Sequence, residues 1–257
     1  MNIQAINNTY YNKKPSFRSW EREVYSAKKG VINRNNTCFF RDGIFFEKLT
    51  KMLSEKFTLT PKVNVYCYGC SDGSEAFSFI IKMLTTLEED NPKKFFPVIA
   101  KDIDNIAIQK ALHNDYKITN DEKFSINKFT ENQFERFFYQ PQNTMNNNSE
   151  QMRVRVNTEL YDYVDFQVGD ILKDYKNIEP KNSVVFARNF WPYIKDYNIR
   201  TGFFKDLYKH LDFGSYFIIG DFDKRGIGYM LQGNLEKDIL KTGFRPTEVK
   251  NVYVKSL

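Results

Sequence analysis

Apolar positions along the first half of the chain follow two alternating patterns. Stretches with apolar residues three and four apart, typical of helices, alternate with short apolar runs that are typical of buried strands. This alternation favours a parallel sheet whose strands are joined by crossover helices. The predicted order is helix Asp42–Phe57, strand Val63–Tyr68, helix Glu75–Leu87, strand Phe96–Asp104 and helix Asn105–Asn114.

The second half returns to this pattern after a polar interruption. The tract QPQNTMNNNSEQ, residues 140–151, is rich in amides and predicts an exposed turn. Because its flanks, FERFFY and MRVRV, could both be strands, we expect a small antiparallel β insertion over about 134–160. The later predicted elements are strands Tyr163–Ile171, Ser183–Arg188 and Ser215–Asp221, helices over 193–211 and 229–244, and a strand over 249–255.

Composition and charge divide the chain unevenly. Of its 257 residues, 41% are hydrophobic and 24 are Phe, which is enough to bury a core and excludes a disordered class. The formal net charge is +6, and residues 1–41 carry the whole excess, with eight basic and two acidic side chains. We therefore expect a short basic helical segment over 1–58, with a helix at Pro15–Gly30, and a main domain over 59–257. Such a segment can bind an acidic protein surface or phosphates, and it also fits a solvated helical face.

The chain offers few signals for a membrane or a metal. No apolar run approaches the ~20 residues that span a bilayer, and the N-terminus lacks the apolar core of a signal peptide, so we expect a cytoplasmic protein. Cys67 and Cys70 form a CxxC, which fits either a metal or redox pair or two small residues flanking a strand end. Because there is no second CxxC and only two histidines are present, we expect no metal.

Polar residues follow four of the predicted strands. In an open parallel sheet, ligands bind outside the carboxyl ends of the strands, so these side chains form the candidate site. The acid after the second strand, Asp102, suits a ribose because a carboxylate accepts from two hydroxyls at once. The alternative for Asp102 is a helix N-cap, a role for which Asp104 competes. The full set is Gly69–Glu75, Asp102, Asp104, Asp170, Arg188 and Asn189.

The loop YCYGCSDGSEAF, residues 66–77, narrows the choice of ligand. It is neither a GxGxxG loop nor a P-loop. Glu75 stands in the first helical turn, where its carboxylate would repel a pyrophosphate but attract an amine. This points to S-adenosylmethionine, which carries a ribose, an adenine, an amino acid and a sulfonium but no phosphate. The competing interpretation of Glu75 is a charge that stabilises the helix N-terminus.

Several stretches of the chain resemble one family. NNTCFFRDG, residues 35–43, is similar to the N-x-T-x-F-F-R-D element of the chemotaxis-receptor methyltransferase (CheR) family. CSDGSEAFS (70–78) is similar to its small-Ser-x-Gly-Glu-Glu-Pro-Tyr-Ser loop, and FARNFWPYI (186–194) is similar to its F-x-R-N-x-x-x-Y motif. Its Asp-Ile-Asp segment, its V-R-V-R segment and its glycine-containing ending resemble KDIDNIAIQKALHNDY (101–116), MRVRVNTELYDYVDF (152–166) and LDFGSYFIIGDFD (211–223).

The resemblance implies an α/β fold of the Rossmann-like class I methyltransferase type. It also implies S-adenosylmethionine-dependent methyl esterification of glutamates on chemoreceptor cytoplasmic helices, with S-adenosylhomocysteine as product. We expect a monomer that does not insert into membranes. Arg41 and Tyr193 match the residues that face the methyl group, and they are the implied catalytic pair. The implied cofactor-binding residues are Asn35, Thr37, Arg41, Gly69, Glu75, Asp102, Asp170, Ile171, Arg188 and Asn189.

The sequence departs from the family pattern in places and leaves two alternatives. Ser74 and Ala76 replace a glutamate and the proline of the family's loop, and we expect a truncated helical N-terminal domain. NFWPY, residues 189–193, is also similar to the Asn-Pro-Pro-Tyr motif of nucleic-acid methyltransferases. It is one residue longer and lacks the first proline, so we do not expect nucleic acid as the partner. The other alternative is a non-catalytic module that binds the cofactor and signals through a partner.

Overall fold

The computed structural model describes residues 22–26, 31–35, 37–87, 91–141, 151–194, 196–225 and 234–256. The chain divides into two units, residues 1–36 and 37–257. In the first unit, strand β1 (Arg22–Ser26) pairs antiparallel with strand β2 (Val31–Asn35). The predicted helix Pro15–Gly30 is therefore wrong for Arg22–Ser26, where Val24 and Tyr25 favour a strand with a pairing partner. The rest of that predicted helix lies outside the described residues.

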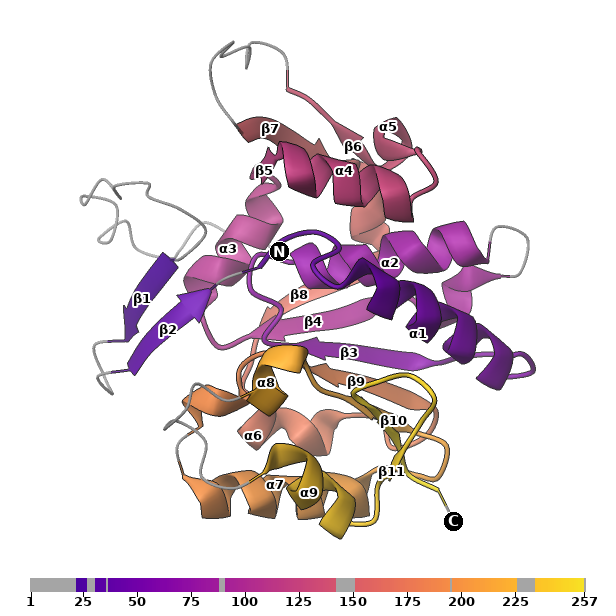
Figure 1. Ribbon diagram of the computed structural model, residues 1–257, viewed down its shortest axis with the longest axis vertical. Coiled ribbons are helices and arrows are strands. Elements are labelled where there is room, and N and C mark those ends of the chain that lie inside the picture. Colours follow the sequence, from indigo (N-terminus) through magenta and orange to yellow (C-terminus); the bar gives the residue numbers. More distant parts are fainter. Residues whose placement is uncertain are drawn as a thin grey trace, which may run out of the picture. The chain divides into compact units, whose positions relative to one another are not determined.

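The second unit is built on a seven-stranded sheet (Figure 1), which confirms the predicted α/β class. The strands follow the order β11-β12-β10-β9-β3-β4-β8. Strands β10, β9, β3, β4 and β8 run parallel, whereas β12 runs antiparallel to β10 and β11. Their bounds are β3 (Asn64–Tyr68), β4 (Val98–Asp102), β8 (Val164–Val168), β9 (Ser183–Ala187), β10 (Tyr216–Ile218), β11 (Arg245–Pro246) and β12 (Val252–Val254).

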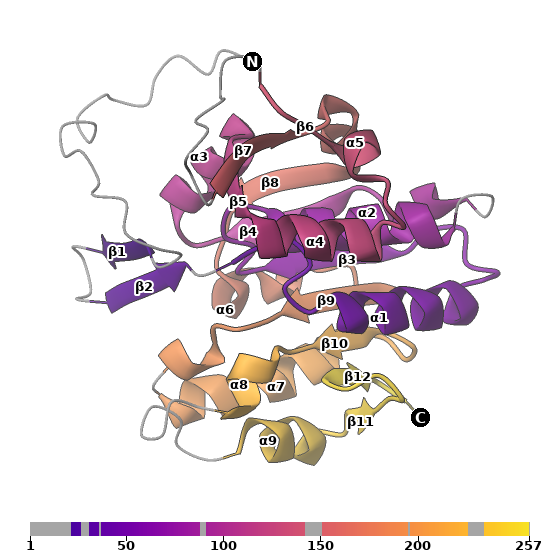
Figure 2. The ribbon, with the colours of Figure 1, turned by 45° about the horizontal axis from the view of Figure 1, so that its top comes forward.

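Helices cover both faces of this sheet (Figures 1 and 2). None of the helices within the described ranges combines the length and the apolar character of a bilayer-spanning segment. The α-helices are α1 (Gly43–Lys56), α2 (Ser74–Thr86), α3 (Asn105–His113), α6 (Ile171–Asp174), α7 (Tyr197–His210), α8 (Asp221–Arg225) and α9 (Leu235–Lys241). Short 3-10 helices are η1 (Pro92–Phe95), η2 (Thr158–Tyr163), η3 (Tyr175–Asn177) and η4 (Trp191–Tyr193).

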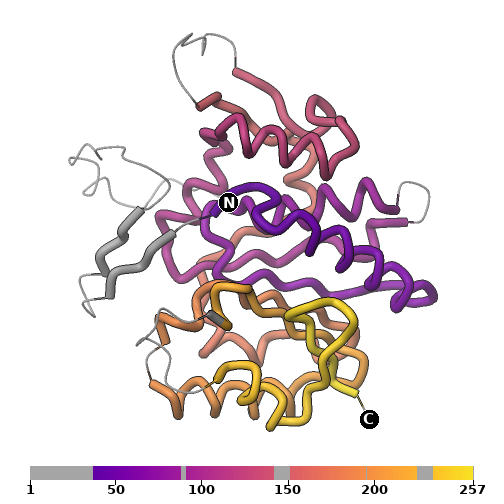
Figure 3. The backbone as a smooth tube through the Cα atoms, viewed as in Figure 1, coloured from indigo at the N-terminus to yellow at the C-terminus, as the bar shows by residue number. Residues whose placement is uncertain are grey.

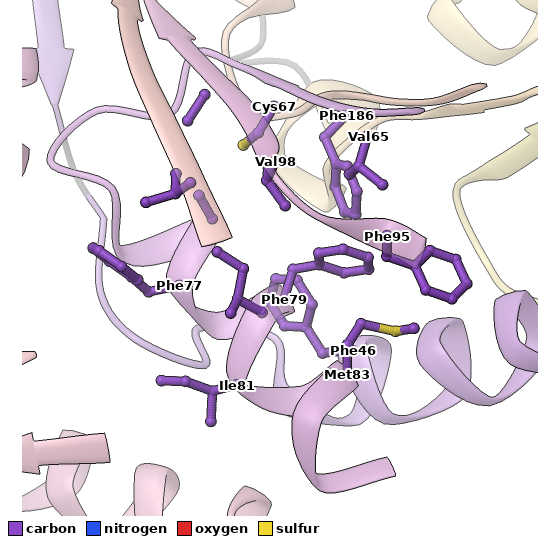
Figure 4. Packing of buried hydrophobic residues seen from close by; sticks show 14 of the residues in the cluster. Phe46, Val65, Cys67, Phe77, Phe79, Ile81, Met83, Phe95, Val98 and Phe186 are labelled. Atoms are coloured by element: carbon purple, nitrogen blue, oxygen red, sulfur yellow. The ribbon is translucent and has the colours of Figure 1, made fainter. Parts of the chain in front are cut away.

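The apolar core lies in two layers, one on each face of the sheet. Successive strand residues point to opposite faces, so Phe186 joins one layer and its neighbour Val185 joins the other. The first layer includes Phe46 of α1 and Phe79 of α2 (Figure 4), and the second includes Phe204 of α7. Because α1 packs on α2, the division between the units falls after residue 36, whereas the sequence had grouped residues 37–58 with the N-terminal segment.

Between α3 and β8 the chain leaves the parallel sheet (Figure 3) and forms a small antiparallel sheet (Figure 1), as predicted, but this sheet begins earlier than residue 134. Its strands are β5 (Tyr116–Thr119), β6 (Phe138–Tyr139) and β7 (Gln151–Val156), in the order β5-β7-β6. Helices α4 (Asn120–Phe129) and α5 (Phe134–Phe137) lie between β5 and β6. Most of FERFFY is therefore helical, and β7 finds its longer partner in the four-residue strand β5, which is too short to show a clear pattern.

Candidate active site at the strand ends

The carboxyl ends of five parallel strands meet at one edge of the sheet, which we call the rim. Tyr68 of β3 pairs with Ala187 of β9 on one side and with Lys101 of β4 on the other. On the far side of β4, Asp102 pairs with Val168 of β8. The residues that follow these pairs are therefore neighbours at the rim, and they include Arg188, Gly69, Asp102 and Asp170.

Asp102 is held by backbone donors at the end of β4. One carboxylate oxygen accepts from the Ser71 N–H at 2.7 Å, and the other accepts from the Asp104 N–H at 2.8 Å. Burial raises the pKa of Asp102, and these two donors oppose the rise. The N-cap of α3 is Asp104, whose side chain accepts from the Ile106 N–H at 2.9 Å. The helix is therefore capped by Asp104 and not by Asp102. Each carboxylate oxygen of Asp102 accepts one N–H and keeps a lone pair for a further donor.

Arg188 lies between two carboxylates. Its Nη1 contacts Glu75 Oε2 at 2.8 Å, and its Nη2 contacts Asp42 Oδ2. The guanidinium also lies 4.4 Å from the ring centroid of Phe45, and the Arg188 side chain is only 3% exposed. Burial raises the pKa of Glu75, and the charge of Arg188 opposes that rise. Glu75 is therefore paired with a cationic side chain of the protein itself, whereas the sequence suggests a carboxylate that attracts the amine of a ligand.

The glycines after β3 let aromatic rings pack against the loop. Gly69 has a φ of +70°, and a Cβ built on it would lie 2.7 Å from the ring of Phe190. Gly73 has a φ of +87° and meets the ring of Phe166 in the same way. The close approach that we expected these glycines to offer a ligand is thus used, at least in part, by neighbouring side chains.

The Thr37–Asp42 element is fixed by two helices. The Phe39 N–H donates to Glu122 Oε1 of α4 at 2.7 Å, and the Phe40 N–H donates to Ser78 Oγ of α2 at 2.8 Å. Thr37 is half-buried and Arg41 is exposed. Arg41 lies close enough to lower the pKa of Glu75 electrostatically, although less than burial raises it.

Three predicted residues have mainly structural roles or lie beyond this unit. Asp170 caps α6 by accepting from the Leu172 N–H at 3.0 Å. Ile171 is buried in the second apolar layer beneath the rim. Asn35 ends β2 in the first unit, and its side chain lies outside the described part of the chain.

The loop after β9 turns sharply at the rim. Asn189 has a φ of +66°, and the N–H groups of Asn189 and Trp191 both donate to the carboxylate of Asp223, at 2.6 and 3.1 Å. Tyr193 is half-buried, and its ring centroid lies 6.1 Å from that of Phe222. Tyr193 therefore shares the loop with Arg188 and Asn189 but packs toward α8.

Sequence reasoning missed four residues that hold this site together. Asp42 stood inside the N-x-T-x-F-F-R-D element, and Asp223 stood just after a predicted strand, so both carried a signal. Ser78 and Glu122 lie within helices, and nothing local marks them. Their partners are 38 and 83 residues away along the chain, so only the fold reveals the contacts.

The two cysteines of the CxxC are part of the interior. Cys67 and Cys70 are both buried, and burial raises the pKa of each thiol well above its ordinary value. The Cys67 Sγ lies 3.7 Å from Glu75 Oε1. Within the described ranges, no group of three or more His, Cys, Asp or Glu residues is arranged to hold a metal ion.

The charges at the rim fit a cationic ligand. Glu75, Asp42 and Asp102 supply three carboxylates, and Arg188 is the guanidinium that joins two of them. The Arg188 Nε is buried and has no hydrogen-bond partner among the described residues, so one further donor is available for an acceptor. Donors and acceptors of this kind suit the ribose and the zwitterionic amino acid of S-adenosylmethionine better than a pyrophosphate.

Comparison with known proteins points in the same direction. The family model described as CheR methyltransferase, SAM binding domain, matches residues 35–225. Among solved structures, the chain is similar to N-methyltransferase NodS from Bradyrhizobium japonicum, with 11% identity over 84% of this chain and 99% of that chain and a TM-score of 0.40. A TehB-like SAM-dependent methyltransferase from Corynebacterium glutamicum aligns at 12% identity over 82% of this chain and 85% of that chain, with a TM-score of 0.37. These structures are too distant to bear on substrate or mechanism, and a comparison with curated proteins gives no match.

Proposed function

The chain belongs to the CheR methyltransferase family, and we propose that it methylates glutamate side chains of chemoreceptors. It is a methyltransferase that uses S-adenosylmethionine, and its acceptor is the proposed part. We further propose that it acts as a monomer on the cytoplasmic helices of the receptor. The observation that carries the proposal is the Asp42–Arg188–Glu75 contact, which joins the element bearing Arg41 to the cofactor loop.

The proposed cofactor contacts divide between the two sides of the rim. Asp102 would accept from the ribose hydroxyls, because both of its oxygens keep a lone pair beyond their backbone donors. Arg188 and Glu75 would meet the amino acid end, with the Arg188 Nε as a free donor among the described contacts. The remaining proposed contacts within this unit are Thr37, Arg41, Gly69, Asp170, Ile171 and Asn189.

The acceptor chemistry needs positioning more than it needs a base. The cofactor supplies a methyl group on a sulfonium, which an ionised carboxylate attacks in line. A bond forms between the acceptor oxygen and the methyl carbon as the sulfur–carbon bond breaks, and its electron pair stays on sulfur. Since a surface glutamate is already ionised at neutral pH, no proton has to be removed. Arg41, which is exposed, would orient the carboxylate, and Tyr193 would line its approach.

The burial of the loop after Asn189 disfavours a nucleic-acid acceptor. Trp191 is fully buried, and its indole Nε1 donates to the Ala187 carbonyl at 2.7 Å. Pro192 is buried as well. Neither ring is therefore available to stack on an extruded base, which is how such enzymes hold their target.

Methyl transfer to receptor fragments tests the proposal. The protein would be incubated with tritiated S-adenosylmethionine and a panel of chemoreceptor cytoplasmic fragments. We expect label in the fragments that is released as methanol by mild base, and no label when the acceptor glutamates are changed to alanine. Cofactor binding without any transfer would favour the signalling module, and base-stable label in added DNA or RNA would favour a nucleic-acid enzyme. Either result would overturn the proposed acceptor.

A further inference from the structure

Asp223 occupies an unusual position for an acidic residue. Its side chain is fully buried in α8, immediately after β10. Its two oxygens accept from three backbone N–H groups, those of Asn189 at 2.6 Å, Gly220 at 2.7 Å and Trp191 at 3.1 Å. We propose that Asp223 is a positioning residue for methyl transfer, which sets the shape of the loop after β9 through these three hydrogen bonds. The proposal rests on the proposed roles of Asn189 and Tyr193 in that loop.

The loop needs such an acceptor because of its backbone conformation. Asn189 adopts a left-handed φ of +66°, a conformation that asparagine reaches more readily than most other non-glycine residues and that turns the backbone sharply. The turn directs the N–H groups of Asn189 and Trp191 toward the buried carboxylate of Asp223. Without the Asp223 carboxylate, both donors would be buried and unpaired, so the loop would have to rearrange to satisfy them.

Gly220, which donates its N–H to Asp223, also packs against the Asn189 side chain. A Cβ built on Gly220 would lie 2.0 Å from Asn189 Oδ1 and 2.9 Å from the Asn189 backbone nitrogen. The Asn189 side chain therefore lies directly against the end of β10, and only glycine leaves room for it. Asp223 bonds to both residues of this contact, so it fixes where Asn189 stands at the rim.

The middle of the loop has a second anchor in the Trp191 side chain. The indole of Trp191 is buried in the second apolar layer and donates to the Ala187 carbonyl at 2.7 Å. The short helix η4 then carries the chain to Tyr193. With the start held by Asp223 and the middle by Trp191, the loop presents Arg188, Asn189 and Tyr193 in one arrangement.

A carboxylate suits this role better than its amide. Its two oxygens offer about four lone-pair sites, enough for three donors, whereas an asparagine offers one oxygen and an NH2 group that would face another N–H. Burial raises the pKa of Asp223 to about 7, while the three N–H donors and the charge of Arg188 favour its ionised form. Replacing Asp223 by Asn keeps the size of the side chain and removes at least one of the acceptor positions.

The test compares Asp223→Asn with a matched variant, Asp238→Asn. Asp238 is also buried, with 4% exposure, but it lies on α9 and accepts from the Tyr197 hydroxyl at 3.0 Å. Both changes remove a buried acid, so both are expected to lower stability. Only Asp223→Asn should change the site. We expect its Kd for S-adenosylhomocysteine, measured by calorimetry, to rise roughly tenfold and its kcat to fall roughly tenfold, with Asp238→Asn within about twofold of wild type.

A second variant keeps the proposal testable if Asp223→Asn does not fold. Gly220→Ala leaves the carboxylate in place but pushes against Asn189, and we expect the same joint loss in Kd and kcat. Wild-type values in either folded variant, or an equal loss in Asp238→Asn, would overturn the inference while leaving the proposed function intact. Failure of the wild-type protein to bind the nucleoside would overturn both.

Discussion

Asp102 and Asp223 both accept hydrogen bonds from the backbone of a neighbouring loop, but we propose different roles for them. At the end of β4, Asp102 accepts from the Ser71 N–H in the loop after β3 and from the Asp104 N–H that follows it. Just after β10, Asp223 accepts from the loop after β9 and from Gly220. Each acid thus ties its own strand end to the loop of the neighbouring strand.

The two acids differ in their exposure and in the number of lone pairs that remain for a ligand. Asp102 serves two N–H donors and remains 6% exposed, whereas Asp223 serves three and has no exposed surface. Asp102 can therefore both support a loop and meet a ligand, while Asp223 can only support. Their burial and their number of donors are thus consistent with the proposed roles of Asp102 as a binding residue and Asp223 as a positioning residue.

The Asp42–Arg188–Glu75 contact, which joins the Thr37–Asp42 element to the loops after β3 and β9, is expected to show the largest effect. Replacing Arg188 by Met leaves the mostly buried carboxylate of Glu75 and the partly exposed carboxylate of Asp42 without their shared partner. We expect the free energy of unfolding to fall by roughly 3 kcal/mol, as measured by urea denaturation. Adding Asp42→Asn and Glu75→Gln to the same protein should restore part of that loss. If Arg188→Met alone is as stable as wild type, the segments that bear Asp42, Glu75 and Arg188 are held together in some other way.

The proposed binding role of Asp102 is tested by its effect on affinity. Asp102→Asn should raise the Kd for S-adenosylhomocysteine roughly 100-fold, because hydrogen bonds from the ribose hydroxyls to a charged acceptor are weakened. The matched control is Asp104→Asn, since asparagine caps a helix as well as aspartate does, and its affinity should stay within about threefold of wild type. Equal losses in both variants would remove the distinction between the two positions.

A third buried acid that supports a loop, Glu122, is expected to make stability depend on pH. Burial raises its pKa from the ordinary 4.5 to about 7, so the folded protein binds more protons than the unfolded chain between these values. Stability therefore falls as the pH rises through this window, and the cost is complete above about 7. Glu122→Gln should remove a decline on the order of 2 kcal/mol between pH 5 and pH 8 in urea denaturation. An unchanged slope would mean that Glu122 titrates normally.

Asp223 contributes to the same decline, which gives the experiment an internal reference. Burial raises the pKa of Asp223 to about 7, so its ionisation also lowers stability as the pH rises. That part of the slope should survive in Glu122→Gln. A completely flat profile in this variant would place the whole effect on Glu122.

The smallest expected effect concerns Tyr193. Tyr193→Phe removes only a hydroxyl beside the proposed methyl path, so kcat should fall about tenfold while the Kd for the nucleoside stays near wild type. Tyr197→Phe is the control, because its hydroxyl donates to Asp238 of α9 at 3.0 Å and is not among the proposed site residues. If both variants keep the wild-type kcat, the Tyr193 hydroxyl has no part in the transfer.

The part of the rim at the ends of β3 and β4 could be largely predicted from the sequence because its signals are local. Val63–Tyr68 and Phe96–Asp104 are apolar runs that end in glycine or acids, and each is followed by helical spacing, so the fold placed Asp102 where it was expected. The matching family elements add residue-level roles that spacing alone does not contain. Long, clearly periodic elements and their carboxyl ends are thus readable without a structure.

The part of the rim at the ends of β9 and β10 depends on contacts between distant segments. The place of Asp223 after a predicted strand marks it as a candidate, but it does not indicate that Asp223 receives N–H groups from residues 32 and 34 positions earlier. Likewise, the strand Arg22–Ser26 resembles a helix until its partner Val31–Asn35 is considered, and β5 is too short to be recognised without β7. Whether a strand-end acid faces a ligand or a backbone is therefore a property of the fold rather than of the motif.

A crystal structure with S-adenosylhomocysteine tests the central claim most directly. We predict that the ribose hydroxyls lie within hydrogen-bond distance of the Asp102 carboxylate and that the amino acid end meets Arg188 and Glu75, while Asp223 keeps its three backbone donors. A nucleoside bound away from the strand ends, or a ribose that does not contact Asp102, would contradict the account.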